Sequence, residues 1–382
     1  MPYAQIGRHR LNYDLQGPEG GEVIVFINGL TQSTTAWLAH QQRLTQSGYR
    51  VLTYDTLGQG LSSKPVLAIP LDQHAEVLAQ LLDALAIPRA FIAGISFGGL
   101  VALRFAIAYP RRVLGLIPIS TFCEMPPQLK AIGQVFHMAI TQVGFPMVQA
   151  MLLPMNFSSR WIDKAQALIP EIARKSYAIN DPYAIQNLME SLNTFTPFAD
   201  ELDQVSCPTL IVNGEFDYLT PRVCHETLRA GIRNSRLVII QHGYHAITLE
   251  FPELTARLFD AFVRHVQAGD WPGDQSAWVA SEDFPAEVLA YRCFGDHLRA
   301  VQAVDAEARR DANAWLLQPP AKKKADAKKT VSKKVSRSPA PAAAKPKSAT
   351  QAAAAIHAKR KPSTAASAKP AKTAGPNQQK AR

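Results

Sequence analysis

A serine flanked by glycines carries a clear chemical signal. Residues 94–98 read Gly-Ile-Ser-Phe-Gly and place Ser96 between an apolar run, 89–93, that predicts a buried strand, and residues 100–108, which predict a helix. A turn this tight strains the serine backbone, and a side chain at either glycine would collide with the neighbouring strand or helix. The hydroxyl is then exposed at a helix N-terminus, where N–H groups can stabilise developing negative charge. The pattern predicts a nucleophile; the alternative is an ordinary N-cap serine.

A histidine and an aspartate that could activate this serine follow later strands. A serine nucleophile needs a base to take its proton and an acid to orient the base. His245 lies in a loop after the last predicted strand, with a glycine two residues earlier, and His242 is the competing base. Asp217 follows another strand, with Glu215 as its nearest rival. The chain order Ser96, Asp217, His245 is the one expected with this type of serine turn. The alternatives are a surface-loop histidine and an aspartate that caps a turn.

Two backbone amides are candidates for an oxyanion hole. One is expected on the residue after the nucleophile, Phe97, and the second in a loop after an earlier strand. Leu30 is the second candidate, because the preceding Gly29 lets the backbone approach the site. Asp55 also ends a predicted strand, but it precedes a glycine-rich run and is expected to fix that turn.

The strand runs favour a parallel sheet. They are apolar without two-residue alternation, and helical patterns such as residues 71–85 separate them. In such sheets ligands gather at the carboxyl ends of the strands, where the residues above stand. We therefore predict an α/β fold with a mostly parallel sheet and helices on both faces. The predicted strands are residues 23–27, 50–54, 90–93, 113–119, 209–212 and 237–240.

Residues 125–200 interrupt the alternation and predict a helical lid. They separate two strand runs and hold six of the seven methionines. Methionine adapts to irregular apolar space, so the lid could line a pocket for a flexible aliphatic group, with core packing as the alternative. The candidates for the substrate pocket are Met147 and Met151 from the lid and Asn28 and Trp37 from the core.

Composition divides the chain near residue 320. The expected parts are an α/β core, a helical lid, a C-terminal helical extension and a basic tail, which span residues 1–124 with 201–268, 125–200, 269–320 and 321–382. The tail holds 17 Lys or Arg, one acid and no aromatic residue, so it is predicted to be disordered. The net charge of the tail is +16. Since the whole chain has a net charge of +10, the remaining residues carry a net charge of −6. The basic balance therefore belongs to the tail alone.

Spaced lysine clusters in the tail suggest a polyanion as partner. Without aromatic residues no base stacking is available, so nucleic-acid binding would be driven by phosphates and independent of sequence. An acidic membrane or a granule surface would serve equally well, and a solvated tail without a partner is the alternative.

Other features exclude several classes of protein. Residues 1–13 lack the pattern of a signal peptide, and no apolar stretch is long enough for a spanning helix. The four cysteines lie far apart, which suits neither a zinc site nor a disulfide-rich module. No metal or organic cofactor is implied. A cytoplasmic location is expected, and the oligomeric state stays open.

Together these features resemble the α/β-hydrolase superfamily over about residues 3–268. The resemblance is carried by Asn28-Gly29, Asp55 with Gly58 and Gly60, Ser96, Asp217 and His245. It implies an eight-stranded, mostly parallel sheet, a helical cap between strands six and seven, and Ser-His-Asp catalysis. Asn28 stands where many members carry His, which alters the polar lining of the site.

A shorter match is similar to 3-hydroxyacyl-ACP transacylases and to synthases of the hydroxyacyloxy-acid lipid of rhamnolipids. It comprises residues 34–37, Thr-Thr-Ala-Trp, after Asn28-Gly29, and Asn213-Gly214 before Asp217. Phe97 stands where this subgroup carries Trp, and residues 218–219, Tyr-Leu, replace its Glu-Tyr. The resemblance implies 3-hydroxy fatty acyl thioesters as substrates.

The sequence therefore predicts a serine hydrolase that acts on a small-molecule ester or thioester with a medium-chain aliphatic acyl group. One alternative is a 3-hydroxyacyl transferase that uses an acyl carrier protein or CoA with the same three residues. The other, from a different class, is a polyanion- or granule-associated binding protein that acts through residues 321–382.

Overall fold

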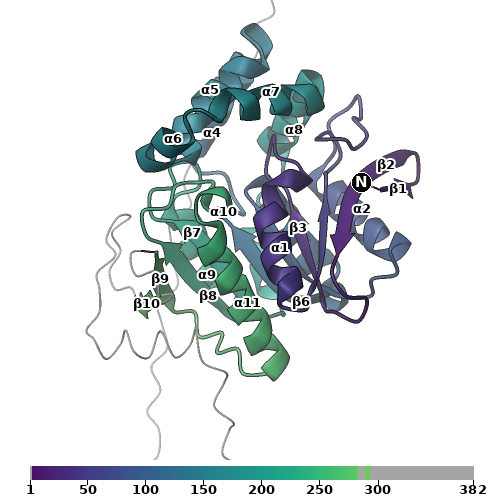
Figure 1. Ribbon diagram of the computed structural model, residues 1–382, viewed down its shortest axis with the longest axis vertical. Coiled ribbons are helices and arrows are strands. Elements are labelled where there is room, and N and C mark those ends of the chain that lie inside the picture. Colours follow the sequence, from purple (N-terminus) through teal and green to yellow (C-terminus); the bar gives the residue numbers. More distant parts are fainter. Residues whose placement is uncertain (1, 283–288, 293–382) are drawn as a thin grey trace, which may run out of the picture. The chain divides into compact units, whose positions relative to one another are not determined.

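A central sheet of ten strands organises residues 2–282 and 289–292, the part of the chain that the computed structural model describes (Figure 1). The strand order is β1-β2-β4-β3-β5-β6-β7-β8-β9-β10. Neighbouring strands from β4 to β9 are parallel, whereas β1, β2 and β10 pair antiparallel. The strands are β1 Tyr3–Ile6, β2 His9–Gln16, β3 Val23–Ile27, β4 Arg50–Tyr54, β5 Ala90–Ile95, β6 Val113–Ile119, β7 Thr209–Gly214, β8 Ser235–Ile240, β9 Ala277–Ser281 and β10 Leu289–Arg292.

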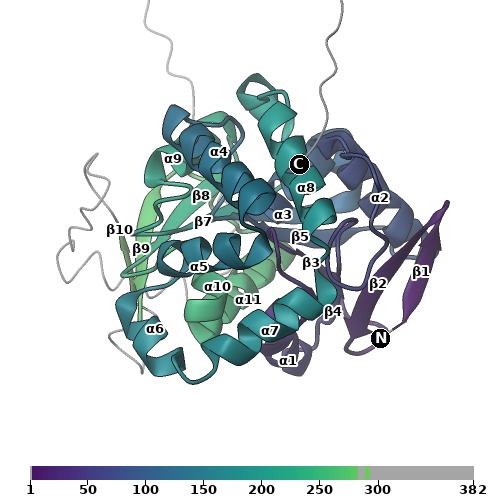
Figure 2. The same ribbon diagram turned by 90° about the horizontal axis from the view of Figure 1, so that it is seen from above.

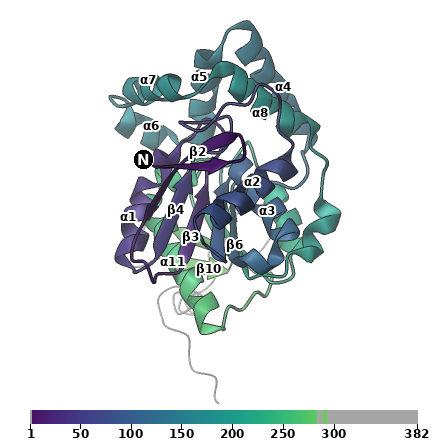
Figure 3. The ribbon, with the colours of Figure 1, turned by 90° about the vertical axis from the view of Figure 1, so that its right-hand side faces the viewer.

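Helices cover both faces of the sheet, because the central strands are apolar on both sides. Every residue of β3 is buried: Val25 and Ile27 belong to one hydrophobic core, and Ile24 and Phe26 belong to the other. The first core lies under α2 (Leu71–Ala84), α3 (Phe97–Ala108) and α9 (Arg222–Gly231), and the second under α1 (Leu38–Gln46) and α11 (Pro252–Ala268). Figure 3 shows the sheet between α1 on one side and α2 with α3 on the other. The predicted α/β fold is confirmed.

Five α-helices stand between β6 and β7, in a stretch that is described throughout. They are α4 Pro127–Gln142, α5 Phe145–Asn156, α6 Ser159–Ala165, α7 Ile169–Ile179 and α8 Pro182–Thr194. Figures 1 and 2 show them over one end of the sheet. Two residues determine where α8 begins: the Asp181 carboxylate caps the helix by accepting the Ala184 N–H at 3.0 Å, and Pro182 occupies the first helical position. We call α4 to α8 the lid.

The predicted helical extension over residues 269–320 is wrong where the structure describes it. Strand β9 pairs parallel with β8, and β10 pairs antiparallel with β9, so the sheet exceeds the eight strands that the family resemblance implies. Residues 278–280 are buried in β9, so pairing and burial determine the structure in place of local helical propensity. Residues 293–320 and the predicted tail, 321–382, lie outside the described residues.

A membrane-spanning helix would have to be both long and strongly apolar. Within the described ranges, no helix meets both conditions.

Candidate active site

Ser96 occupies a strained turn between β5 and α3. Its backbone angles are φ +54° and ψ −118°, which L-residues rarely adopt. A Cβ on Gly94 would overlap the Gly98 carbonyl, and a Cβ on Gly98 would overlap the Ile27 carbonyl. Both glycines are therefore required, as the sequence predicts. The Ser96 side chain makes no capping hydrogen bond to α3, which contradicts the alternative of an ordinary N-cap serine.

Hydrogen bonds with β6 and the loop after it hold the backbone of Ser96. Its N–H donates to the Ile119 carbonyl at 2.9 Å, and its carbonyl accepts the Thr121 hydroxyl at 2.8 Å. Thr121 is fixed in turn, because its N–H donates to Nε2 of His225 at 2.9 Å. Burial lowers the pKa of His225 to about 4, so its ring is neutral near pH 7 and can accept this bond.

His245 and Asp217 form a buried hydrogen-bonded pair. His245 Nδ1 lies 2.9 Å from Asp217 Oδ2 and 3.0 Å from Oδ1. An ionised carboxylate only accepts, so Nδ1 carries the proton and Nε2 keeps a lone pair. A nitrogen in that state can take a proton from a nearby hydroxyl.

Four further donors hold the Asp217 carboxylate in place. They are Leu219 N at 3.0 Å, Thr220 N at 2.8 Å, Thr220 Oγ1 at 2.7 Å and Asn213 Nδ2 at 3.3 Å. Burial opposes ionisation, but the electrostatic attraction of the His245 ring and the hydrogen bonds from His245 and Thr220 outweigh it, so the pKa of Asp217 lies below its usual value. The role of Thr220 was not predicted from the sequence.

The rival residues are paired with each other. The His242 N–H donates to Glu215 Oε2 at 2.8 Å, and His242 Nδ1 lies 3.7 Å from the same oxygen. The His242 side chain is 59% exposed, and neither residue lines the cavity described below. This geometry favours His245 and Asp217 as the base and the acid.

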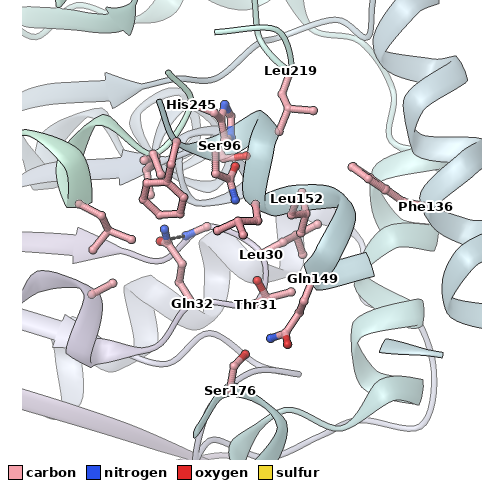
Figure 4. Close-up of a pocket in the computed structure, with 18 of the residues that line it drawn as sticks. Leu30, Thr31, Gln32, Ser96, Phe136, Gln149, Leu152, Ser176, Leu219 and His245 are labelled. Atoms are coloured by element: carbon pink, nitrogen blue, oxygen red, sulfur yellow. Dashed lines mark hydrogen bonds between the residues drawn. The ribbon is translucent and has the colours of Figure 1, made fainter. Parts of the chain in front are cut away.

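The Leu30 amide lies near Ser96 in the structure (Figure 4), and the Phe97 amide follows Ser96 in the sequence. Neither N–H has a protein acceptor within the part of the chain that the structure describes. The amides around Leu30 are engaged: Gly29 N–H donates to Gln32 Oε1 at 3.0 Å, and Thr31 N–H donates to Gln59 Oε1 at 2.5 Å. These two glutamines, which sequence reasoning missed, hold the loop, Gln32 from within it and Gln59 from the turn after β4, and leave the Leu30 N–H available.

Asp55 fixes the glycine-rich turn, as the sequence predicts. Its carboxylate accepts the backbone N–H groups of Thr34 and Leu61, each at 2.8 Å, and the Asn12 amide at 2.9 Å. Burial raises the pKa of Asp55 in spite of these bonds. The residue ties two loops together at the end of β4 and does not line the cavity.

Ser96 and His245 open into a single cavity of about 760 Å³ between the lid and the strand ends. Figure 4 shows their side chains next to each other, with Leu30 nearby. Much of the wall is apolar and comes from the lid and the segment just before it; it includes Met125, Leu129, Phe136, Leu152, Phe157 and Trp161. A cavity of this size and character suits a small apolar ligand with one reactive group.

The four residues predicted for the substrate pocket do not line this cavity, so that prediction is wrong. Trp37 is fully buried under the sheet, stacks on Phe26 and donates from Nε1 to Asn28 Oδ1 at 2.8 Å. Asn28 is buried too, and donates to the Tyr54 carbonyl at 3.0 Å. Both are structural.

The two predicted lid methionines also point elsewhere. Met147 is 43% exposed on α5, and Met151 packs against the hydrophobic core. The methionines that do line the cavity are Met125 and Met189. Composition identified the right segment, but only the packing of the helices decides which side chains face inward.

The parallel sheet, the lid and the serine turn define an α/β-hydrolase. A family model described as serine aminopeptidase, S33, matches residues 19–252, which is more than half of the chain. The chain belongs to this family, and the superfamily predicted from the sequence is confirmed.

Three relatives are distant but align over nearly their whole length. A protein of Variovorax paradoxus (strain S110) named "Putative carbamate hydrolase RutD" is 27% identical over 265 residues, which cover 69% of this chain and 99% of that protein. An enol-lactonase from Burkholderia xenovorans LB400 has a TM-score of 0.64 and 21% identity, and covers 69% of this chain and 99% of its own. A hydrolase from Pseudomonas aeruginosa PA01 has a TM-score of 0.63 and 25% identity, covering 69% and 97%. These likenesses support a hydrolase of the α/β class.

Proposed function

We propose that the protein is a serine hydrolase that cleaves carboxylic esters or thioesters through an acyl-enzyme on Ser96. The observation that carries the proposal is the hydrogen-bonded pair of His245 and Asp217 beside Ser96, at the wall of an apolar cavity. A base with a lone pair and a serine in a strained turn that lines the cavity are the two parts that covalent acyl transfer requires.

The reaction follows from the positions of these groups. Ser96 Oγ attacks the acyl carbon while His245 Nε2 takes the hydroxyl proton, and Asp217 stabilises the resulting imidazolium. The N–H groups of Leu30 and Phe97 donate to the oxyanion. The intermediate collapses, the carbon–oxygen or carbon–sulfur bond breaks, and His245 returns the proton to the leaving alcohol or thiol. Water then attacks the acyl-enzyme with the same base, which releases the acid and Ser96.

The cavity supports a medium-chain aliphatic acyl group as the substrate. Its volume of about 760 Å³ and its apolar lid residues would remove such a chain from water. Met125, just before the lid, and Met189 of α8 could adapt to chains of different shape.

A panel of p-nitrophenyl esters and acyl thioesters of graded length tests the proposal. We expect hydrolysis by the wild type and a loss of several orders of magnitude in kcat for Ser96→Ala. A fluorophosphonate probe should label the wild type but not Ser96→Ala. Ser33→Ala is the matched control, because Ser33 lines the same cavity and should leave labelling unchanged. Labelling that survives Ser96→Ala would contradict the nucleophile assignment.

The acyl acceptor and the leaving group are tested in separate experiments. The name of the Variovorax relative makes aryl carbamates a natural addition to the panel. The resemblance to transacylases favours acyl transfer as a second candidate activity of the same site. Supplying acyl thioester with and without CoA or an acyl carrier protein distinguishes the two, and free acid as the only product would eliminate transfer.

A separate binding role is proposed for the basic tail. Residues 321–382 carry a net charge of +16 without aromatic residues. This composition supports electrostatic, sequence-independent attraction to a polyanion such as nucleic acid.

A further inference from the structure

Polar side chains interrupt the apolar wall of the cavity on one side. Gln149 comes from α5, Ser176 from α7 and Thr31 from the loop after β3, and all three line the cavity. Figure 4 shows them together on the side away from His245, with Phe136 and Leu152 on the apolar wall. We call Gln149 and Ser176 the polar subsite.

Gln149 has hydrogen-bonding capacity that the protein leaves unused. Its Oε1 atom is buried and has no hydrogen-bond partner among the residues that the structure describes. A buried amide oxygen without a donor is costly, so proteins rarely keep one unless another molecule supplies the donor. Because Gln149 lines the cavity, a small rotation of its side chain would bring Oε1 to a hydrogen-bond donor of a ligand there.

Ser176 complements Gln149 as a donor. Its Oγ accepts a hydrogen bond from Asn180 Nδ2 at 3.2 Å, and the same nitrogen donates to the Thr31 carbonyl at 3.2 Å. Asn180 therefore ties the Ser176 hydroxyl to the loop that follows Leu30. Because this bond uses a lone pair of Oγ, the hydroxyl hydrogen remains available to donate into the cavity.

The charge of the subsite narrows the kind of group that fits. Neither Gln149 nor Ser176 is charged. Lys175 also lines the cavity, but its side chain is 71% exposed and its Nζ lies 3.4 Å from Glu171 Oε1 on its own helix. A charged substituent would lose hydration here without a buried counter-ion. A neutral group that both donates and accepts matches the subsite.

We infer that Gln149 and Ser176 select substrates whose otherwise apolar acyl part carries a neutral donor–acceptor group, a hydroxyl or an amide. This inference rests on the proposed function, because it concerns the acyl part of the ester or thioester substrate. Oε1 of Gln149 accepts the O–H or N–H of the substrate, and the Ser176 hydroxyl donates to its oxygen. An acyl chain without that group leaves the Gln149 oxygen buried and unpaired, so the site discriminates against it.

Matched substrates and matched variants test the inference. p-Nitrophenyl esters of graded chain length are compared with esters of the same length that carry a hydroxyl or a secondary amide. We expect the wild type to favour a polar ester by about tenfold or more in kcat/KM. Gln149→Met keeps the side-chain volume and should abolish or reverse this preference. Gln142→Met is the control, because Gln142 is exposed on α4 and does not line the cavity, so the preference should persist.

A binding readout separates this inference from the proposed function. The same esters are titrated calorimetrically into Ser96→Ala and into Ser96→Ala with Gln149→Met, where no turnover is needed. Tighter binding of a polar ester that disappears with Gln149→Met supports the subsite even if wild type hydrolyses no ester, a result that would defeat the proposed function alone. Equal binding of polar and apolar esters to Ser96→Ala, or a preference that survives Gln149→Met, overturns the inference. The polar ester that is preferred more strongly, the one with a hydroxyl or the one with an amide, identifies the group that the subsite binds. Thermal unfolding verifies that each variant is folded.

Discussion

The orientation of His245 depends on how Asp217 is held. The carboxylate accepts from the imidazole and from four donors supplied by Asn213, Leu219 and Thr220. With its oxygens fixed in this way, Asp217 can hold only the imidazole form that carries its proton on Nδ1. The chemistry proposed for Ser96 therefore relies on a carboxylate that the turn after β7 positions.

Replacing Asp217 with asparagine tests this dependence. The amide presents an N–H as well as an oxygen, so it can stabilise the imidazole form in which Nε2 carries the proton and cannot act as a base. We expect kcat for an activated ester to fall by about 10⁴-fold with the fold retained. Asp203→Asn, at an exposed position, is the control. Near-normal turnover by Asp217→Asn would show that His245 does not need this partner.

The same substitution predicts a pH effect on stability. The pKa of Asp217 is lower in the folded protein than the value of about 3.9 in an unfolded chain. Its ionised form therefore stabilises the fold fully above about pH 4, and this contribution is lost as the pH falls through the lowered pKa. The difference in unfolding free energy between wild type and Asp217→Asn should shrink below about pH 4 in urea titrations. A difference that stays constant there would contradict the assigned direction.

Sequence identified the residues whose chemistry is local and missed those that act through the fold. Ser96 could be predicted because steric demands place glycines on both sides of it. Gln32, Gln59 and Thr220 could not, because their partners are backbone or carboxylate groups that only the folded loops bring near. Gln149 was missed for the same reason, since its significance lies in an absent partner.

At the scale of elements, one side chain joins the lid to the loop that carries Leu30. Asn180 follows α7 and is buried; its Nδ2 donates to the Thr31 carbonyl at 3.2 Å, and its Oδ1 accepts the Gly60 N–H at 3.3 Å. Thr31 has φ +65°, an unfavourable conformation that its neighbours must hold. The position of the Leu30 amide is thus coupled to the lid.

Asn180→Leu should weaken this coupling. It leaves the Thr31 carbonyl and the Gly60 N–H without their partner, and we expect kcat for a short ester to fall by about 10- to 100-fold. Asn187→Leu is the matched control. Asn187 also links the lid to the core, because its Nδ2 donates to the Val66 carbonyl at 2.9 Å, but within the described part of the chain it has no hydrogen bond to the loop that carries Leu30. Equal losses in kcat for the two variants would mean that general loosening of the lid explains the effect.

The central strands could be predicted closely and the C-terminal ones could not. Runs such as residues 23–27 and 113–119 are apolar throughout, and burial on both faces of a sheet leaves no other pattern for them. Residues 289–292 pair with β9 at the end of the sheet, and this pairing outweighs the local helical tendency.

At the scale of the whole molecule, three buried histidines make the fold sensitive to acid. Burial lowers the pKa of His40 to about 3 and that of His74 and His225 to about 4. An unfolded histidine has a pKa of about 6.5, so between about pH 6.5 and 4 the unfolded chain binds protons that the folded one refuses. Stability is therefore lost as the pH falls through this window.

His74→Leu should reduce this loss. His74 packs edge-on against the Phe97 ring, with centroids 5.1 Å apart, and removing it takes away about one proton from the difference between folded and unfolded states. Urea unfolding at pH 7 and pH 5 should show a smaller decrease in stability for His74→Leu than for wild type. His137→Leu, on the partly exposed surface of the lid, is the control. An unchanged decrease would show that His74 titrates alike in both states.

Removal of residues 321–382 tests the binding role proposed for the tail. Truncation after residue 320 removes the +16 segment and leaves a chain with a net charge of −6. We expect binding to a DNA duplex, measured by fluorescence anisotropy, to be lost, and binding by the full chain to weaken steeply as salt increases. Esterase activity should be unaffected. Binding that survives truncation would place the polyanion site elsewhere.

Strand β9, which lies after residue 268, covers the edge of β8. All six residues of β8 are buried, and β9 satisfies its outer hydrogen-bonding edge, anchored by the bidentate ion pair of Arg236 with Asp274 at 2.7 and 2.8 Å. A chain cut at 268, the limit that family resemblance would suggest, would leave this apolar strand as an open template for pairing between molecules. Size-exclusion chromatography should find that shortened form in aggregates, whereas the chain ending at 320 stays dispersed.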